Sequence, residues 1–238
     1  MSVCLDNDYQ VTSDDLIQGR AGIIILLLLM YKTTQDKMYL DIAQKVGIDL
    51  VKSIQSKHCL AGMAHGYSGM AVAMAFLGSY TGEEKYKEIV LELCRKEDQL
   101  FDCSMNNWLD IREGREHPRN TVAWCHGSAG ILLARALIHK ISGLSINQLF
   151  KDIPLNQVID QICQTEKTDW CLCHGQAGLL VIEKYIRHVF DYEEEKWYED
   201  AAKYLDKRLS IEDILNYGMM QGLAGIGIFL LILGVGKR

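Results

Sequence analysis

Long apolar runs recur along the chain at regular distances. They cover residues 23–31, 70–77, 131–138, 179–186 and 226–233. A helix that is apolar on nearly every side is buried in a folded protein. The five runs therefore predict five buried inner helices.

A second kind of segment lies between the apolar runs and has a single apolar face. In residues 37–54, Tyr39, Ile42, Val46 and Leu50 recur at helical spacing. Residues 83–94 and 193–209 follow the same pattern. Each unit thus pairs an inner helix with a half-exposed outer helix, and no stretch shows a convincing period-two strand pattern.

A Gly-x-x-Gly motif precedes each apolar run. Its first glycines stand at positions 19, 66, 127, 175 and 222, which gives steps of 47, 61, 48 and 47 residues. A fixed period of this kind is typical of repeat architectures. We expect one all-α domain over residues 1–238, either a solenoid or a closed α/α toroid of about five helix pairs. Glycines three residues apart also allow close helix packing, so a purely structural role for the motif stays open.

The step of 61 residues exceeds the others by at least 13 residues. The polar stretch 102–119 has a suitable length and contains Pro118, one of only two prolines in the chain. We therefore expect a surface insertion at this position.

Composition excludes several classes of protein. A net charge of −6 argues against a dedicated nucleic-acid binder. The longest apolar stretches, residues 22–31 and 223–235, are too short for membrane spans, and the acidic N-terminus lacks a signal peptide. We expect a cytoplasmic protein whose eight cysteines are reduced, with metal binding or burial favoured over disulfides.

Cysteine and histidine occupy equivalent positions in consecutive units. Cys125 corresponds to Cys173, and the residues that follow them are His126 and His174. Cys125, Cys173 and His174 form a donor set that suits Zn²⁺ and leaves a fourth coordination position open. Cys171 is a rival ligand that lies outside the repeated register.

Two further residues are candidates for acid/base work. His65 occupies the slot of His174 but has no cysteine neighbour, and imidazole titrates near neutral pH. Asp15 precedes Gly19 by four residues, where it could orient a histidine, bind substrate or cap the first inner helix. His126 and Trp124 are neighbours of this site without an assigned role.

At these residues the chain resembles the lanthionine synthetase cyclase (LanC-like) family. The matching text is Ala-His-Gly-Tyr-Ser-Gly at 64–69, Trp-Cys-His-Gly at 124–127, Cys-His-Gly at 173–175 and Gly-Leu-Ala-Gly at 222–225. The Trp-Cys-His-Gly text is most similar to the C-terminal cyclase domain of class II lanthipeptide synthetases (LanM). The likeness covers about residues 15–233.

The resemblance implies an α/α toroid with zinc held by Cys125, Cys173 and His174. It implies that His65 is the acid/base residue and that Asp15 lies near the site. The implied reaction is Michael addition of a peptide cysteine thiol to dehydroalanine or dehydrobutyrine, which forms a lanthionine or methyllanthionine ring. The implied partner is a dehydrated precursor peptide, leader plus core.

The resemblance also implies more helix pairs than the five glycine motifs account for. The chain is therefore expected to lack the N-terminal part of the full toroid and to expose apolar flanks, such as that of the first inner helix. A dehydratase region, or the missing helices on another chain, would be a partner. Two alternatives stay open: a non-catalytic peptide- or protein-binding module, and an enzyme that adds glutathione to dehydrated residues.

Overall fold

The computed structural model describes residues 11–55, 57–192 and 218–233, and the regular secondary structure of this part of the chain is almost entirely helical. The inner helices coincide with the predicted apolar runs: α1 (Arg20–Thr34), α3 (Tyr67–Thr81), α5 (Ser128–Ser142), α8 (Gln176–Phe190) and α10 (Leu223–Leu233). The outer helices are α2 (Lys37–Gln55), α4 (Lys85–Asp98), the short α6 (Ile146–Phe150) and α7 (Leu155–Gln164). The predicted outer helix over 193–209 lies outside the described residues.

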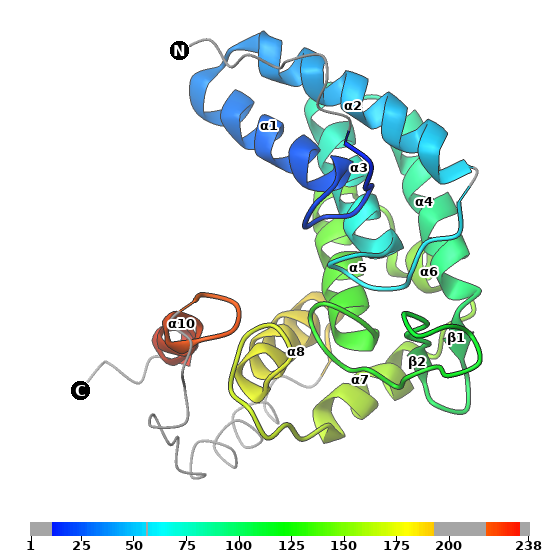
Figure 1. Ribbon diagram of the computed structural model, residues 1–238, viewed down its shortest axis with the longest axis vertical. Coiled ribbons are helices and arrows are strands. Elements are labelled where there is room, and N and C mark those ends of the chain that lie inside the picture. Colours follow the sequence, from blue (N-terminus) through cyan, green and yellow to red (C-terminus); the bar gives the residue numbers. More distant parts are fainter. Residues whose placement is uncertain (1–10, 56, 193–217, 234–238) are drawn as a thin grey trace.

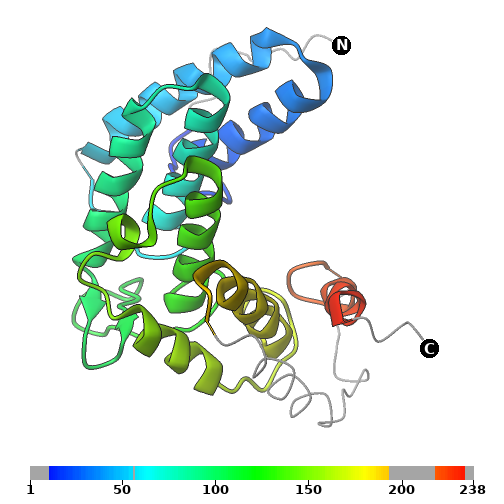
Figure 2. The same cartoon turned by 180° about the vertical axis from the view of Figure 1, so that it is seen from behind.

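The helix pairs follow one another around an open arc (Figures 1 and 2), with α1 and α10 at its two ends. Each inner helix packs on the next, in the order α1, α3, α5, α8 and α10, and α2 and α4 cover α1 and α3 from outside. The predicted all-α architecture of repeated helical pairs is confirmed. In the described part of the chain, no helix combines the length and the apolar character that crossing a bilayer requires.

The glycine motif shapes the loop that enters each inner helix. The first glycine directly precedes α1, α3, α5 and α8, at positions 19, 66, 127 and 175. A Cβ on the second glycine would collide with the backbone carbonyl of the residue six positions earlier. The pairs are Gly22 with Leu16, Gly69 with Met63, Gly130 with Trp124, Gly178 with Leu172 and Gly225 with Met219. The loop therefore folds back over the first helical turn, and only glycine leaves room for it.

We term the residues that lead into an inner helix its entry loop: 13–19, 60–66, 121–127, 169–175 and 218–222. Backbone hydrogen bonds join neighbouring entry loops. Amide N–H groups donate from Leu16 to Ala64, from Ala64 to Cys125, from Trp124 to Cys173 and from Cys173 to Met220, at 2.8 to 3.1 Å. The acceptor is always the residue two positions before the first glycine of the next unit. Equivalent positions of successive units are thereby placed side by side.

The predicted insertion is only partly a surface feature. Its first residues form a small antiparallel pair, β1 (Phe101–Asp102) with β2 (Asn107–Trp108). Trp108 is fully buried and its indole N–H donates to Asp98, while the Asn107 side-chain oxygen accepts from the backbone N–H of Ser128 at the start of α5. The expectation of a surface segment is wrong for this half, because its polar groups find partners inside the fold. Strands of two residues are too short to produce an alternating pattern.

A buried ion-pair network links α4 to the entry loop of α3. Arg135 on α5 is fully buried and lies 3.3 Å from the carboxylate of Glu97. The same carboxylate accepts from the backbone N–H groups of Gly62 and Ser68 at 3.0 and 3.1 Å. Burial raises the pKa of Glu97, and the Arg135 charge opposes that rise. Glu97 thus fixes the loop that contains His65 through backbone hydrogen bonds on both sides of this residue.

The first inner helix differs from the others in its burial. On α3, ten of fifteen residues are buried, whereas on α1 only three are. Leu26 and Leu29 on α1 are 58% and 55% exposed, and Ile17 in the preceding loop is 53% exposed. The expectation that every apolar run is buried is wrong for α1, because in the described structure α1 has an inner-helix neighbour, α3, on one side only. The expected exposed flank is confirmed.

The second glycine of the motif is testable by substitution. Gly130→Ala should lower the free energy of unfolding by about 1–3 kcal/mol, because its Cβ would displace the Trp124 carbonyl. Gly227→Ala on α10 meets no atom within 4 Å and should be neutral or stabilising by up to about 1 kcal/mol. Urea denaturation measures both, and equal changes at the two sites would contradict the collision.

Candidate functional site

The loop register brings two cysteines together from positions 48 residues apart. Cys125 precedes α5 and Cys173 precedes α8, each by the same number of residues. Their thiols are close enough for each to shift the pKa of the other, and the backbone N–H of Trp124 donates to the carbonyl of Cys173 at 3.0 Å. The cysteines within the described residues are free thiols.

The two thiols shift each other's pKa in opposite directions. The contact with Cys173 lowers the pKa of Cys125 to about 4, with further help from the imidazoles of His126 and His174, although burial acts in the opposite direction. The same contact raises the pKa of Cys173. Two adjacent thiolates repel each other unless a cation lies between them, and divalent zinc would meet that need. The sulfur pair therefore fits the metal that the sequence predicts.

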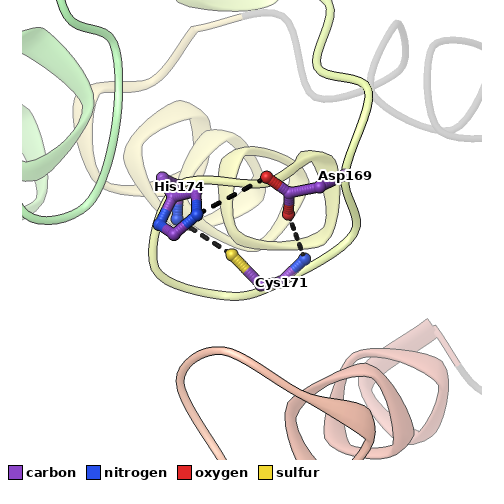
Figure 3. A group of neighbouring side chains, drawn as sticks. All are labelled: Asp169, Cys171 and His174. Atoms are coloured by element: carbon purple, nitrogen blue, oxygen red, sulfur yellow. Dashed lines mark hydrogen bonds and ion pairs between the residues drawn. The ribbon is translucent and has the colours of Figure 1, made fainter. Parts of the chain in front are cut away.

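The predicted third ligand, His174, lies against Asp169 and Cys171 (Figure 3). His174 Nε2 lies 3.6 Å from a carboxylate oxygen of Asp169, and the backbone N–H of His174 donates to Cys171 Sγ at 3.3 Å. The donor atoms of Asp169, Cys171 and His174 lie within 4.8 Å of one another. The imidazole is half exposed. The set Cys125, Cys173 and His174 stays a prediction.

Asp15 and His65 form a pair between the first two entry loops. His65 Nδ1 lies 3.0 Å from Asp15 Oδ2, and Asp15 Oδ1 accepts from the backbone N–H groups of Ile17 and Gln18. Burial would raise the pKa of Asp15, but the hydrogen bonds with His65 and Gln18 outweigh it and lower the pKa. Asp15 both closes the turn before α1 and orients His65. If the proton is on Nδ1, then Nε2 is left available for proton transfer.

His126 lies beside His65 and close to the cysteine pair. The two ring centroids are 5.7 Å apart. His126 is 2% exposed, and among the described residues neither of its ring nitrogens has a nitrogen or oxygen hydrogen-bond partner, although its imidazole lies close enough to Cys125 to lower the pKa of that thiol. Buried polar groups without partners are rare in native proteins and can indicate a missing ligand. The side chain of its neighbour Trp124 packs against the core, and the backbone N–H of Trp124 donates to the carbonyl of Cys173.

The structure adds residues that sequence reasoning missed. Arg112, from the insertion, donates two hydrogen bonds to the buried carboxylate of Asp110, one from Nε at 2.9 Å and one from a terminal guanidinium nitrogen at 2.6 Å. Burial alone would raise the pKa of Asp110, but these bonds lower it to about 2. The hydrogen bond to Asp110 also raises the pKa of Arg112, with a smaller contribution from Cys125. Asp169 was missed as well, because neither residue belongs to the repeated motif and only the folded loops show their neighbours.

Asp15 and His65 also line an open cavity with Lys57, Cys59 and Met70. The site as a whole consists of loop residues at the N-terminal ends of the inner helices, with two thiols, three imidazoles and a carboxylate, and of a nearby guanidinium from the insertion. Such a set can bind a thiophilic metal and move a proton next to it.

Comparison with known proteins agrees with this arrangement. The model of the family described as "Lanthionine synthetase C-like protein" matches residues 2–238. This chain belongs to that family. The lacticin 481/lactococcin biosynthesis protein LcnDR2 of Lactococcus lactis subsp. lactis is 30% identical over 233 residues, and the match covers 90% of this chain and 24% of that protein. The resemblance to lanthionine cyclases is confirmed at the level of the family.

A solved structure confirms the toroidal architecture. Nisin cyclase superposes with a TM-score of 0.60 at 19% identity, over 96% of this chain and 64% of that chain. At this identity the likeness shows the fold. The lanthionine synthetase C-like chain described here thus spans about a quarter of LcnDR2 and less than two thirds of nisin cyclase.

The low pKa of Cys125 predicts unusual reactivity in metal-free protein. Because the thiolate exists above a pKa of about 4, alkylation of Cys125 by iodoacetamide should proceed at a nearly constant rate between about pH 5 and pH 8. Cys163, whose pKa burial raises to about 12, should stay unmodified over this range. Mass spectrometry after timed quenching measures both. A Cys125 rate that climbs about tenfold per pH unit would contradict the lowered pKa of Cys125.

Proposed function

We propose that this chain is, or forms part of, a zinc-dependent lanthipeptide cyclase that acts on a dehydrated precursor peptide. Its reaction would be addition of a peptide cysteine thiol to dehydroalanine or dehydrobutyrine. The observation that carries the proposal is the pairing of Cys125 with Cys173 in equivalent repeat positions, within the loop cluster that also holds the Asp15–His65 pair. Membership of the family supports it.

Cys125, Cys173 and His174 would hold the metal. Zinc, when bound, would supply a lowered pKa for the substrate thiol and keep the sulfur nucleophilic. The two cysteine sulfurs are positioned by the backbone bonds of their loops, so little reorganisation is needed on their side. His174 would have to turn from Asp169 toward the sulfurs.

His65 would move the proton. The substrate sulfur forms a bond to Cβ, the electron pair of the Cα=Cβ bond shifts onto the adjacent carbonyl as an enolate, and Cα then takes up a proton. His65 as imidazolium would donate it, and the carboxylate of Asp15 at 3.0 Å would stabilise that charged form. His126, which is buried and has no nitrogen or oxygen hydrogen-bond partner among the described residues, would donate to the peptide carbonyl oxygen on which the enolate charge develops.

The exposed flank of α1 suggests what completes the arc. Leu26 and Leu29 present apolar surface at the end of a series of packed inner helices. We propose that further helices of the same repeat cover this flank. A dehydratase region or N-terminal helices on another chain would supply them, in keeping with the greater length of nisin cyclase.

The activity is tested with the zinc-loaded protein and a dehydrated precursor peptide that retains its leader. Free peptide thiols should disappear with no change in peptide mass, since ring closure adds and removes no atoms. Folded, zinc-loaded protein that leaves the thiols free would reject the cyclase proposal for this chain. A mass increase equal to glutathione, in its presence, would favour the glutathione-adding alternative.

The role of His65 has its own test. His65→Ala should keep its zinc, because His65 lies outside the proposed ligand set, but should close rings about 10² to 10⁴ times more slowly. His117→Ala, in the insertion, is the matched control and should leave the rate unchanged. Zinc content by atomic emission and thiol consumption over time are the two measurements. Loss of zinc in His65→Ala would show that the ligand set is wrong.

A further inference from the structure

A second group of metal-type donors lies in the entry loop of α8, beside the cysteine pair. Asp169, Cys171 and His174 point toward one another in Figure 3, with donor atoms within 4.8 Å of one another. The repeat does not require this group. The positions of Asp169 and Cys171 are occupied by Leu60 and Gly62 in the second unit, and by Thr121 and Ala123 in the third.

Hydrogen bonds to backbone N–H groups hold Asp169 and Cys171 in place, whereas the His174 side chain is half exposed. The Asp169 carbonyl accepts from the N–H of Gln176 at 2.8 Å, and the Cys171 carbonyl accepts from the N–H of Gly175 at 3.1 Å. The Asp169 carboxylate accepts from the N–H of Cys171 at 2.8 Å. A Cβ at Gly175 would collide with Asp169 and Cys171, so glycine makes the tight loop possible. Asp169 and Cys171 are therefore preorganised by the chain itself.

We infer that Asp169, Cys171 and His174 form an outer capture site for a zinc-class divalent ion. Thiolate, imidazole and carboxylate together suit Zn²⁺. Asp169 and His174 are each about half exposed, at 48% and 50%, so an ion arriving from solvent reaches them directly. Cys171 lies at the buried side of the group.

His174 connects this site to the proposed cyclase centre, and this part of the inference rests on the proposed function. The same imidazole is the third member of the set with Cys125 and Cys173. One imidazole nitrogen serves one ion, so the two sites cannot both be complete. Rotation of His174 from Asp169 toward the cysteine pair would transfer the ion inward, where two thiolates replace one thiolate and a carboxylate.

Anaerobic Co²⁺ titration of the full chain tests the capture site. The double variant Cys125→Ser/Cys173→Ser should still bind one Co²⁺, with roughly half of the wild-type thiolate-to-cobalt absorbance, because one thiolate replaces two. Adding Cys171→Ser should abolish the band. Adding Cys103→Ser instead, an exposed cysteine in the insertion, is the matched control and should leave it intact. Asp169→Asn keeps an acceptor for the Cys171 N–H and should weaken binding.

The outcomes separate the two proposals. A double variant that is folded by circular dichroism but shows no thiolate band overturns the capture site. A band equal to that of wild type shows instead that Cys125 and Cys173 are not the ligands, which rejects the proposed centre and leaves the outer site standing. In otherwise unaltered protein, Cys171→Ser should preserve the final absorbance but slow its appearance in stopped-flow mixing. An unchanged rate overturns the capture role.

Discussion

The backbone hydrogen bonds between successive entry loops are the constraint on which the rest of the structure depends. Each loop folds back over the first turn of its helix, and its residue two positions before the first glycine accepts an N–H from the preceding loop. Backbone groups have one geometry regardless of side chain, so this contact repeats through units of different sequence. The result is a row of equivalent positions along one rim of the helical arc.

Each unit can contribute a different functional side chain at the equivalent position of its entry loop. Cys125 and Cys173 occupy the same position in neighbouring units, two residues before the first glycine. His65 and His126 occupy the following position in their units, and their ring centroids are 5.7 Å apart. The helices and their buried network, in which Glu97 grips the loop of His65, supply a rigid support. The loops supply the functional groups, as is usual where a scaffold positions a site.

The burial of an inner helix depends on how many inner helices flank it, as a comparison of α3 with α1 shows. An inner helix flanked on both sides, such as α3, buries most of its residues, whereas α1 has a flank that exposes Leu26 and Leu29. The apolar composition of a helix indicates that it is suited to burial, whereas its observed burial depends on the helices that pack against it. On α1 the two differ, because Leu26 and Leu29 are apolar and yet exposed.

The sequence by itself determined the repeat, the helical pairs and the equivalence of Cys125 with Cys173, because the period and the glycine spacing reflect local steric requirements. It could not determine which way His174 turns, that Asp169 meets it, or that Arg112 comes near Cys125. It also predicted an insertion on the surface, where the structure buries Trp108 and uses Asn107 to cap α5. Those contacts join loops with no shared period, so only the tertiary packing could decide them. Side-chain direction and partner choice depend on distances between segments, and a one-dimensional pattern does not contain these.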